Sequence, residues 1–418
     1  MKPFHITKAS VIIVIQLLVL SFLTLSLGLK SREAASETYF LSEQDDSAPP
    51  GEEKEKDFIR WVDFTVPAEV MEKAFRLDIN TCQAPVHLDW IQLLAFLGAR
   101  YGGDFSRFRQ ADLDSLAEAL KNGTSMDTLA EGLKYYPYYK EAYGAVLGGM
   151  VGYFDQEAGP EEAASETAGP EQASTEETGS GTWVTKYGLK AFSPIARDFP
   201  YSDYDDFGVS RSYGYKRRHL GHDMMGQVGT PIIAVESGTV EALGWNQYGG
   251  WRLGIRSFDH KRYYYYAHLR KNYPYQSGLE VGSVVQAGDV IGYLGRTGYS
   301  RTENTNNIDD PHLHFGLELI FDESQKDSNN EIWVSCYELV KFLNLNRCEA
   351  VKVEGTKEWK RLYGIKDPLV PVQPATPSQA GPAAESQAEP LAKSQAGPQT
   401  ESQAGPQTDP QAGSQAES

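Results

Sequence analysis

Two histidines that are two residues apart, His312 and His314, stand in an otherwise apolar stretch that ends at Leu319. The proline before them, Pro311, favours an extended backbone, and the residues that follow are typical of a β-strand. Side chains two apart in a strand point to the same face, so the two imidazoles project side by side. Together they can bind a metal ion, or one can bind while the other moves protons. Taken alone, so short a motif more often marks two half-exposed histidines that are hydrogen-bonded to their neighbours.

A second group of polar residues lies upstream, where Asp223 follows His219 by four positions. Gly221 stands between them, and a glycine permits a tight bend that lets an imidazole and a carboxylate converge. One carboxylate and two imidazoles suit zinc, because they combine borderline nitrogen ligands with a hard oxygen and leave a fourth position for water. Such a centre hydrolyses its substrate with metal-activated water, so it needs no serine or cysteine nucleophile.

The surrounding region, residues 182–370, is predicted to be mainly β. Its glycine-rich, β-branched and aromatic runs predict short strands joined by turns, in an antiparallel sheet or barrel-like sandwich. The predicted strands cover residues 230–245, 250–258, 261–269 and 282–295. Strand alternation places a further polar residue, His268, on the same face as Tyr264 and Tyr266. A helix is expected to close the region at residues 331–345.

Three short motifs, in this order along the chain, resemble a known family: HLGHD (219–223), YAHL (266–269) and PHLHF (311–315). They are similar to the zinc metallopeptidases of the lysostaphin/LytM type, peptidase family M23, and the resemblance covers about residues 185–350. It implies a lysostaphin-like catalytic domain with Zn²⁺ as its cofactor. The zinc ligands that it implies are His219, Asp223 and His314. The implied catalytic residues are His312, which orients or deprotonates the attacking water, and His268, which donates to the oxyanion.

The sequence departs from the family pattern in two places. The residue before Asp223 is usually apolar in the family but is His222 here. We expect His222 to lie behind the ligands or on the surface, because three ligands and a water already fill a zinc site. The alternative is that His222 replaces His219 as a ligand. The second departure is the segment 301–310, which is expected to reshape one wall of the substrate groove.

The resemblance implies a zinc-dependent endopeptidase that hydrolyses peptide cross-bridges of bacterial peptidoglycan. The alternative is a catalytically weak or inactive relative that serves as a scaffold or binding protein in a cell-envelope complex, including one of sporulation. A full set of five polar positions favours the enzyme, since a protein free of catalytic demand need not keep them around one cavity. The sequence does not distinguish a glycyl, D-alanyl or γ-glutamyl bond as the one that is cut.

The remaining parts of the chain are predicted from composition. Residues 9–29 are uncharged and mostly apolar, and as a helix they would span about 32 Å, close to the hydrocarbon core of a bilayer. We therefore expect a single-pass transmembrane anchor, with the catalytic domain outside the cytoplasm; the alternative is a cleaved signal peptide and a secreted protein. The other predicted segments are a cytoplasmic stub (1–8), a charged stem (30–57), a small all-α domain of unknown role (58–154, with helices at 87–103 and 112–123), a disordered acidic linker (155–181) and a disordered repeat tail (371–418). The linker is expected to let the tethered catalytic domain search its surroundings.

The negative charge is concentrated in three of these stretches. Residues 31–57, 155–181 and 371–418 carry net charges of −6, −8 and −4, which together equal the −18 of the whole chain. Nucleic acid is therefore a poor partner, because phosphate contacts need a basic surface. The three cysteines form no CxxC pair, so neither a thiolate zinc site nor a disulfide framework is expected.

Overall fold

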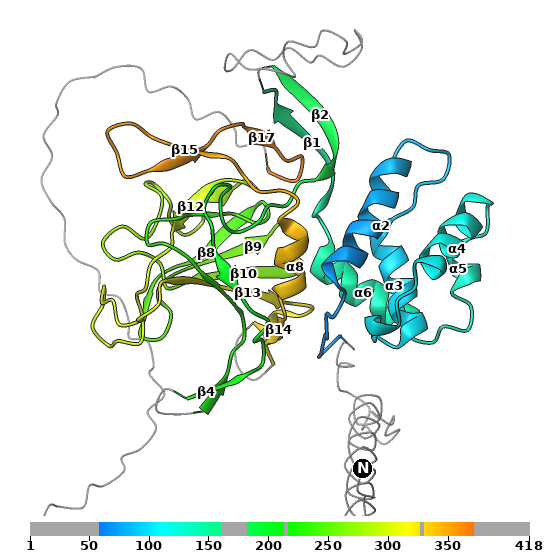
Figure 1. Ribbon diagram of the computed structural model, residues 1–418, viewed down its shortest axis with the longest axis horizontal. Helices are drawn as coiled ribbons and strands as arrows, with labels where there is room; N and C mark the ends of the chain where they lie inside the picture. The colour runs from blue at the N-terminus through cyan, green and yellow to red at the C-terminus, as the bar shows by residue number, and fades with distance from the viewer. Residues whose placement is uncertain (1–57, 160–181, 213–215, 327–329, 372–418) are drawn as a thin grey trace, which may run out of the picture. The chain divides into compact units, whose positions relative to one another are not determined.

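The computed structural model describes residues 58–159, 182–212, 216–326 and 330–371. Its main feature is an eight-stranded antiparallel sheet (Figure 1), so the predicted mainly β fold of the second region is confirmed. Seven strands follow one another across the sheet in this order: β11 (Val284–Val285), β8 (Gly238–Asn246), β9 (Gly250–Ser257), β10 (Arg262–Ala267), β13 (His312–Leu319), β6 (His222–Met225) and β3 (Ser202–Asp203). The eighth strand, β14 (Ile332–Val334), pairs with the end of β13.

The central strands have one apolar face and one polar face. Tyr264 and Tyr266 on β10 are completely buried, and both pack against Phe315 on β13, with ring centroids 6.3 and 5.4 Å apart. Tyr263 and Tyr265 alternate with them along β10 and line a pocket. Because the pleat sends successive side chains to opposite sides, one face of the sheet builds the core and the other builds a site.

Shorter strand pairs accompany this sheet. They are β7 (Pro231–Ile233) with β12 (Val290–Tyr293), β15 (Ala350–Lys352) with β16 (Trp359–Arg361), and β4 (Ser210–Ser212) with β5 (Lys216–Arg218). Each of the four stretches predicted as strands contains strands, so that part of the sequence analysis is confirmed. Two of the three cysteines, Cys336 and Cys348, are buried as free thiols.

The helix predicted at residues 331–345 is wrong in its first part. Ile332–Val334 form β14, because this stretch pairs with the part of β13 beyond the point where its ladder with β6 ends. The helix α8 begins later and covers Tyr337–Leu343. A local pattern could not separate the two, since a short apolar run suits either a strand or a buried helix.

The region before the sheet is helical, as predicted. Its elements are α2 (Ala68–Thr81), α3 (Trp90–Tyr101), η1 (a 3₁₀ turn, Phe105–Arg107), α4 (Gln110–Lys121), α5 (Met126–Leu129) and α6 (Tyr136–Leu147). Helix α3 begins where the carboxylate of Asp89 accepts a hydrogen bond from the backbone N–H of Gln92. It ends at Gly102, whose positive φ of 64° suits a glycine.

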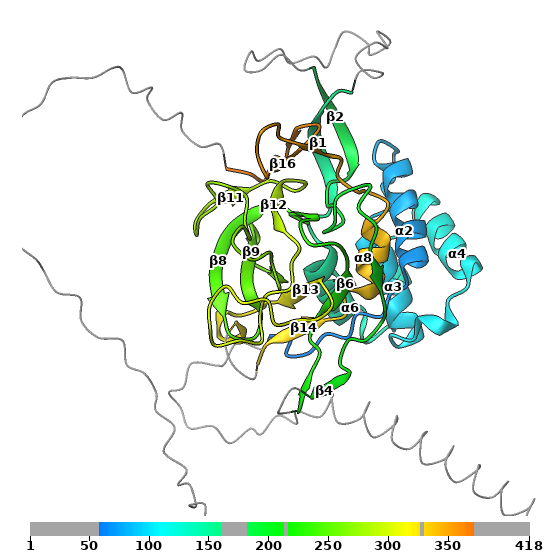
Figure 2. The ribbon, with the colours of Figure 1, turned by 60° about the vertical axis from the view of Figure 1, so that its left-hand side comes forward.

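The helices and the sheet share a continuous hydrophobic core. Phe342 of α8 stacks on Trp90 of α3, with centroids 5.4 Å apart, and meets Phe75 of α2 edge-on at 5.7 Å. The buried guanidinium of Arg262 on β10 donates to the carbonyl oxygen of Ala145 in α6 at 2.8 Å. Figure 2 shows α8 between the sheet and α2. The helical region is therefore packed against the β region and is not joined to it by a linker alone.

The acidic linker predicted to begin at residue 155 is wrong at its start. After α6, the strand β1 (Val151–Glu157) forms seven antiparallel residue pairs with β2 (Trp183–Leu189). A third strand, β17 (Ile365–Lys366), pairs with the other edge of β1. The acidic stretch thus connects two strands that pair with each other. It therefore does not give the catalytic domain the freedom of movement that was expected from the sequence. Sequence reasoning missed β1 because its partner lies beyond the acidic stretch.

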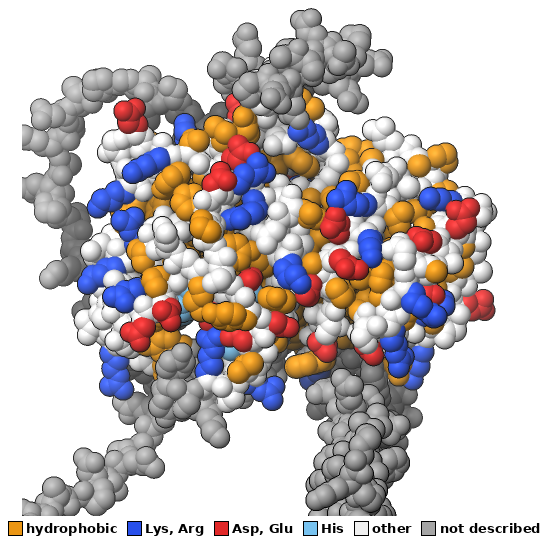
Figure 3. Space-filling view, in the orientation of Figure 1, with side chains coloured by type: hydrophobic (Ala, Val, Ile, Leu, Met, Phe, Trp, Pro, Cys, Tyr) orange, Lys and Arg blue, Asp and Glu red, His pale blue; other side chains and the backbone are white. Residues whose placement is uncertain are grey.

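Several predictions fall outside the described residues: the stub, the anchor at 9–29, the stem at 30–57 and the repeat tail beyond 371. Within the described ranges, no helix is both long and apolar enough to cross a membrane. On the face of the molecule that Figure 3 shows, basic and acidic side chains are interspersed.

Candidate metal centre

Three polar side chains meet where β6 and β13 pair. His219 Nε2 lies 3.0 Å from Asp223 Oδ1 and 3.1 Å from His314 Nδ1, and His314 Nδ1 lies 2.8 Å from Asp223 Oδ1. His219 and Asp223 are each 2% exposed, while the side chain of His314 is 17% exposed. The structure therefore brings together the three residues that the resemblance implied as ligands.

The register of the two strands explains this meeting. Asp223 on β6 lies directly opposite His314 on β13, and residues opposite each other in a ladder share a face. His219 precedes β6, and its ring reaches the carboxylate four residues further along. The prediction that His312 and His314 share a face is confirmed, because His312 Nε2 lies 3.8 Å from Asp223 Oδ1.

Gly221 lies in a bend directly before β6, as the sequence suggested, and it has a second role. Its φ lies outside the left-handed region that favours glycine. A Cβ at this position would lie 2.5 Å from both Cε1 and Nε2 of His314, and 3.0 Å from the carbonyl oxygen of Phe315. The missing side chain therefore makes room for the ring of His314, so the glycine also permits a close approach.

Two residues that the sequence analysis did not single out, Asp206 and Arg211, contact the ligand residues His219 and Asp223. Asp206 Oδ1 lies 3.0 Å from His219 Nδ1, and Arg211 Nη1 donates to Asp223 Oδ2 at 2.7 Å. Arg211 also donates to Asp206, which joins the two contacts. No sequence signal marked these residues, because they lie in a loop and a short strand outside the family motifs, where no period relates them to the ligands.

Both ring nitrogens of His219 face carboxylate oxygens. A neutral imidazole carries one N–H and can donate to only one of them. When Nδ1 donates to Asp206, the lone pair of Nε2 points at acceptor atoms of Asp223 and His314, and these atoms repel one another. A cation between them attracts all three. Zinc at about 2.0–2.1 Å from tetrahedral ligands sets them about 3.3 Å apart, close to the observed 2.8–3.1 Å. The donor set therefore fits zinc.

Burial and hydrogen bonding act in opposite directions on the carboxylate. Burial by itself raises the pKa of Asp223, but the hydrogen bonds with His219 and His314 outweigh it and hold that pKa well below its usual value. Burial lowers the pKa of His314, and Asp223 opposes the shift only in part. Near neutral pH the carboxylate is charged and the ring of His314 is neutral, which are the forms that bind a metal.

Two further histidines lie beside the cluster. The ring of His268 is 4.8 Å from that of His312 and 5.8 Å from that of His314, measured between centroids. Nδ1 of His268 lies 2.9 Å from the carbonyl oxygen of Thr297, and Nδ1 of His312 lies 2.7 Å from that of Asp310. Since a carbonyl oxygen only accepts, Nδ1–H donates in both rings. Their Nε2 atoms therefore carry lone pairs whenever the rings are neutral.

The prediction that His268 shares a face with the core tyrosines of β10 is wrong. The strand ends one residue earlier, and His268 has a positive φ of 62°, so the regular alternation does not reach it. Its ring lies with His312 and His314 instead. Burial lowers the pKa of His268 well below its usual value, and the two neighbouring histidines lower it further.

His222 does not belong to the converging group. It follows the strand alternation of β6, so its side chain leaves the sheet on the face opposite to that of Asp223. Its Nε2 lies 2.9 Å from Asp203 Oδ2, and its ring meets that of Tyr337 edge-on at 5.6 Å. His222 is 2% exposed, so it lies buried behind the site, and it does not take the place of His219.

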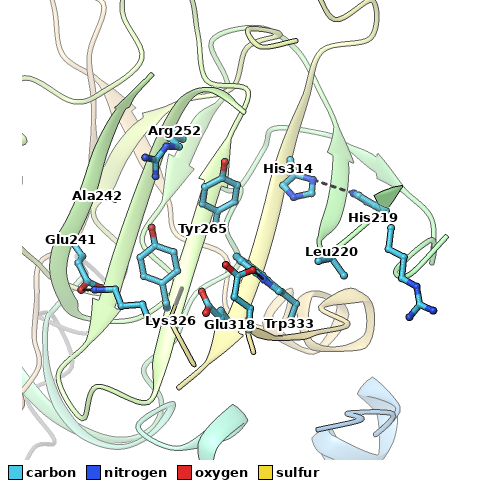
Figure 4. Close-up of a pocket in the computed structure, with 13 residues that line it drawn as sticks. His219, Leu220, Glu241, Ala242, Arg252, Tyr265, His314, Glu318, Lys326 and Trp333 are labelled. Atoms are coloured by element: carbon cyan, nitrogen blue, oxygen red, sulfur yellow. Dashed lines mark hydrogen bonds and ion pairs between the residues drawn. The ribbon is translucent and has the colours of Figure 1, made fainter. Parts of the chain in front are cut away.

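A pocket of about 590 Å³ opens beside His314 on the polar face of the sheet (Figure 4). Aromatic side chains from β10 and β14 line the pocket together with charged groups. The lining includes Glu241, Arg252, Tyr263, Tyr265, Glu318, Lys326 and Trp333. The segment 301–310, which was expected to form a groove wall, does not contribute to this lining. Its Asn304 instead accepts a hydrogen bond from the indole N–H of Trp251 at 2.9 Å.

The sequence of this region matches a known family. Residues 217–328 fit the sequence model described as Peptidase family M23. The matched stretch contains all five predicted site residues, from His219 to His314. This part of the chain is therefore a peptidase family M23 domain, as the resemblance of its motifs predicted.

Individual relatives are similar over the same part of the chain. The L-Ala--D-Glu endopeptidase of Bacillus subtilis (strain 168) is 37% identical over 124 residues, which are 30% of this chain and 36% of that protein. Glycyl-glycine endopeptidase ALE-1 of Staphylococcus capitis is 38% identical over 98 residues, 23% of this chain and 24% of that protein. Among solved structures, the catalytic domain of the antimicrobial peptidase lysostaphin from Staphylococcus simulans has 29% identity and a TM-score of 0.26, over 34% of this chain and 92% of that one. The chain thus spans about a third and a quarter of the two relatives' lengths.

Proposed function

We propose that this chain is a zinc-dependent endopeptidase that cleaves the peptide cross-bridges of peptidoglycan. The observation that carries the proposal is the convergence of His219, Asp223 and His314, with two further histidines, beside an open pocket. The M23 domain and the endopeptidases among its relatives support the reaction class. A zinc ion held by the three side chains would act as a Lewis acid and lower the pKa of a water to about 7.

His312 is the general base in this proposal. The carbonyl oxygen of Asp310 accepts its Nδ1–H, so the neutral ring has a fixed tautomer and a lone pair on Nε2. That Nε2 lies 3.8 Å from Asp223 Oδ1, on the side of the ligand atoms. A base needs this combination of fixed orientation and free lone pair to accept the proton of the attacking water.

His268 is the proposed donor to the substrate oxygen. Its Nδ1–H is committed to the carbonyl oxygen of Thr297, so only Nε2 can donate, and it can do so only while the ring is charged. Burial keeps the pKa of this ring low and the resting ring neutral. Negative charge that develops on the substrate oxygen raises the pKa of the ring, so His268 would take up a proton from solvent as that charge appears and donate it from Nε2 to that oxygen.

Asp206 and Arg211 position the ligands in this scheme. A carboxylate on the far nitrogen of a metal-binding histidine fixes the tautomer and orientation of the ring, and Asp206 stands in that relation to His219. Arg211 occupies Oδ2 of Asp223, which leaves Oδ1 directed at the two imidazoles.

Two substitutions separate metal binding from catalysis. His314→Ala should abolish both the zinc content of the purified protein and the release of peptide fragments from purified peptidoglycan. His312→Ala should keep most of the zinc and lose activity by about 100-fold or more, as expected for a general base. The matched control is His260→Ala, since His260 is exposed in the turn before β10 and should affect neither quantity.

Walls with different bridges decide between this proposal and the scaffold alternative. Mass spectrometry of the products identifies the bond that is cut. If the wild-type protein binds zinc and releases no fragments from any of these walls, the chain is a binding or scaffold protein of the cell envelope and the endopeptidase proposal is wrong.

We also propose that residues 9–29 anchor the protein in the membrane, with the peptidase outside the cytoplasm. The support is their uncharged, apolar composition in the sequence. Fractionation of cells that produce the full chain should recover it with the membranes, and deletion of residues 1–29 should move it to the soluble fraction. A full-length product in the soluble fraction contradicts the anchor, and a shortened secreted product indicates a cleaved signal peptide.

A further inference from the structure

Arg252 on β9 is a cation that the surrounding pocket does not neutralise. Its side chain is half-buried, and within the part of the chain that the structure describes its Nε has no hydrogen-bond partner. Two other acidic residues of the lining have partners: Glu241 forms an ion pair with Lys326, and Glu331 accepts a hydrogen bond from the indole of Trp333 at 2.7 Å. A partly desolvated arginine attracts a carboxylate, and its planar fork can hold one through two N–H donors.

The strand register relates Arg252 to the metal centre. The ladder between β9 and β10 ends with the pair Leu253 and Tyr266, and Arg252 and Ala267 are the residues next to that pair. Ala267 pairs with His314 on the next strand. Neighbouring strands lie about 4.8 Å apart, so the backbones of Arg252 and His314 are separated by about 10 Å. Both side chains line the same pocket, and Figure 4 shows Tyr265 between them.

This separation fixes where a carboxylate would sit on a bound peptide. One residue of an extended peptide spans about 3.3–3.6 Å. The arginine side chain extends from its backbone toward the substrate, so the distance from the guanidinium to the metal centre is shorter than the backbone separation of about 10 Å. A carboxylate that binds the guanidinium would therefore belong to a residue one or two positions from the scissile bond. The acidic lining residue Glu318 pairs with Tyr263, four positions beyond His314 along β13, and thus lies toward the other end of the pocket.

We propose that Arg252 makes this pocket a subsite for a carboxylate, so that the enzyme prefers acidic stem peptides over glycine bridges. The inference rests on the proposed endopeptidase function and narrows its substrate. The substrate carries a free carboxylate on the residue beside the scissile bond or on the next one, as a peptide with an L-Ala–D-Glu bond does. A glycine bridge offers only amide groups at these positions and leaves the guanidinium without a partner.

Three synthetic peptides test this preference with the wild-type protein. They are an L-Ala–D-Glu–L-Lys peptide with a free glutamyl carboxylate, the same peptide with that carboxylate amidated, and pentaglycine. The value of kcat/KM for the acid should exceed that for the amide by about 10-fold to 100-fold, the range that one charge-assisted hydrogen bond supplies. Pentaglycine should be cleaved more slowly than the acid.

Substitutions assign the preference to the guanidinium. Arg252→Gln should raise KM for the acidic peptide until its kcat/KM equals that of the amide measured with the same variant. Arg252→Lys keeps the positive charge and should restore part of the preference. Arg197→Gln is the matched control, because Arg197 is 50% exposed and lies outside the pocket lining.

The outcomes separate this inference from the function on which it rests. Equal kcat/KM for acid and amide, or faster cleavage of pentaglycine, overturns the carboxylate subsite and leaves the endopeptidase proposal standing. A lack of hydrolysis of all three peptides and of purified peptidoglycan removes the proposed function and the inference together. The wild-type comparison does not depend on whether any variant folds.

Discussion

The same sheet carries two buried polar clusters that differ in how their charges are balanced. In the first, the guanidinium of Arg262 bonds to Glu236 twice, at 2.8 and 3.0 Å, and to Asp259 at 2.8 Å. Tyr264 donates its hydroxyl to Glu236 as well, and Nη1 of Arg262 reaches the carbonyl oxygen of Ala145. Burial by itself lowers the pKa of Arg262, but the charge of Glu236 outweighs it, and the pKa is raised. Both carboxylates here bond to the same guanidinium of the chain.

The second cluster is arranged in the opposite way. Its three ligand atoms, from His219, Asp223 and His314, converge on one point, and the carboxylate of Asp223 supplies a negative charge that attracts a cation. Arg211 and Asp206 stabilise this arrangement from outside without filling its centre. Burial and charge alone therefore do not mark a functional site. A cluster whose cation and carboxylates bond to one another holds the fold together, whereas acceptor atoms that converge on one point mark a place for a cation.

The largest expected effect is the loss of stability when the first cluster is broken. Arg262→Ala leaves the buried carboxylate of Glu236 without its partner, which typically costs about 3–5 kcal/mol of the free energy of unfolding. Denaturant unfolding measures this loss. Zinc content per folded molecule should not change, and its disappearance would show that the two clusters are not independent. A double substitution, Arg262→Met with Glu236→Gln, should recover part of the stability because it removes both charges.

A smaller effect, confined to the second cluster, is expected from Gly221→Ala. The added methyl group would push the ring of His314 out of position, and a displacement of about 1 Å at a reacting group can reduce activity about 100-fold. Zinc titration and hydrolysis assays measure the change. The matched control is Gly188→Ala on β2, where an added Cβ meets no atom within 4 Å. Equal behaviour of the two variants would contradict the close-approach role of Gly221.

A weaker effect should follow from loosening the support behind His219. Asp206→Asn keeps an oxygen acceptor and removes the charge, so zinc affinity should fall by about 10-fold, the lower end for changes behind a metal ligand. The exposed neighbour provides the control, because Asp205→Asn changes the same charge without touching the histidine. Identical zinc affinities for the two variants would remove the positioning role of Asp206.

The smallest effect concerns the pH dependence of the metal-free protein. Burial lowers the pKa of His222, His268 and His314 from the ordinary value of 6.5. Just below pH 6.5 the unfolded chain therefore binds more protons than the folded one, so the free energy of unfolding falls as the pH drops. Thermal unfolding followed by circular dichroism in a chelator should show Tm declining from neutral pH toward pH 5. A Tm that rises over this range would contradict the lowered pKa values.

The parts of the fold that sequence reasoning predicted are those that a local pattern encodes. The strand alternation of β13 gave the shared face of His312 and His314, and the helices predicted at 87–103 and 112–123 correspond to α3 and α4. The ligand set came from three motifs and their resemblance to a family. Each of these signals lies within a few neighbouring residues.

The parts that were missed depend on the folded chain. Strand β1 is stabilised by β2, a partner about thirty positions away, and Arg211 meets Asp223 only after the loop before β6 has folded back. His268 lies on the other face of the sheet from the one predicted, because its φ is positive. The alternation of apolar and polar residues along a strand does not predict such a backbone angle. Gly221 was singled out for its bend, but its close approach to His314 was missed, since that ring belongs to a residue about ninety positions later.

The ladder between β1 and β2 has a consequence for the integrity of the protein. Glu157 pairs with Trp183, so the residues that flank the acidic stretch lie next to each other in the sheet. A protease that nicks the chain between residues 160 and 181 would produce two fragments that stay associated, because seven residue pairs and a common apolar interior still join them. The chain should therefore tolerate a cut, a lengthening or a replacement at this place, and its two halves, produced separately, should reassemble into the same fold.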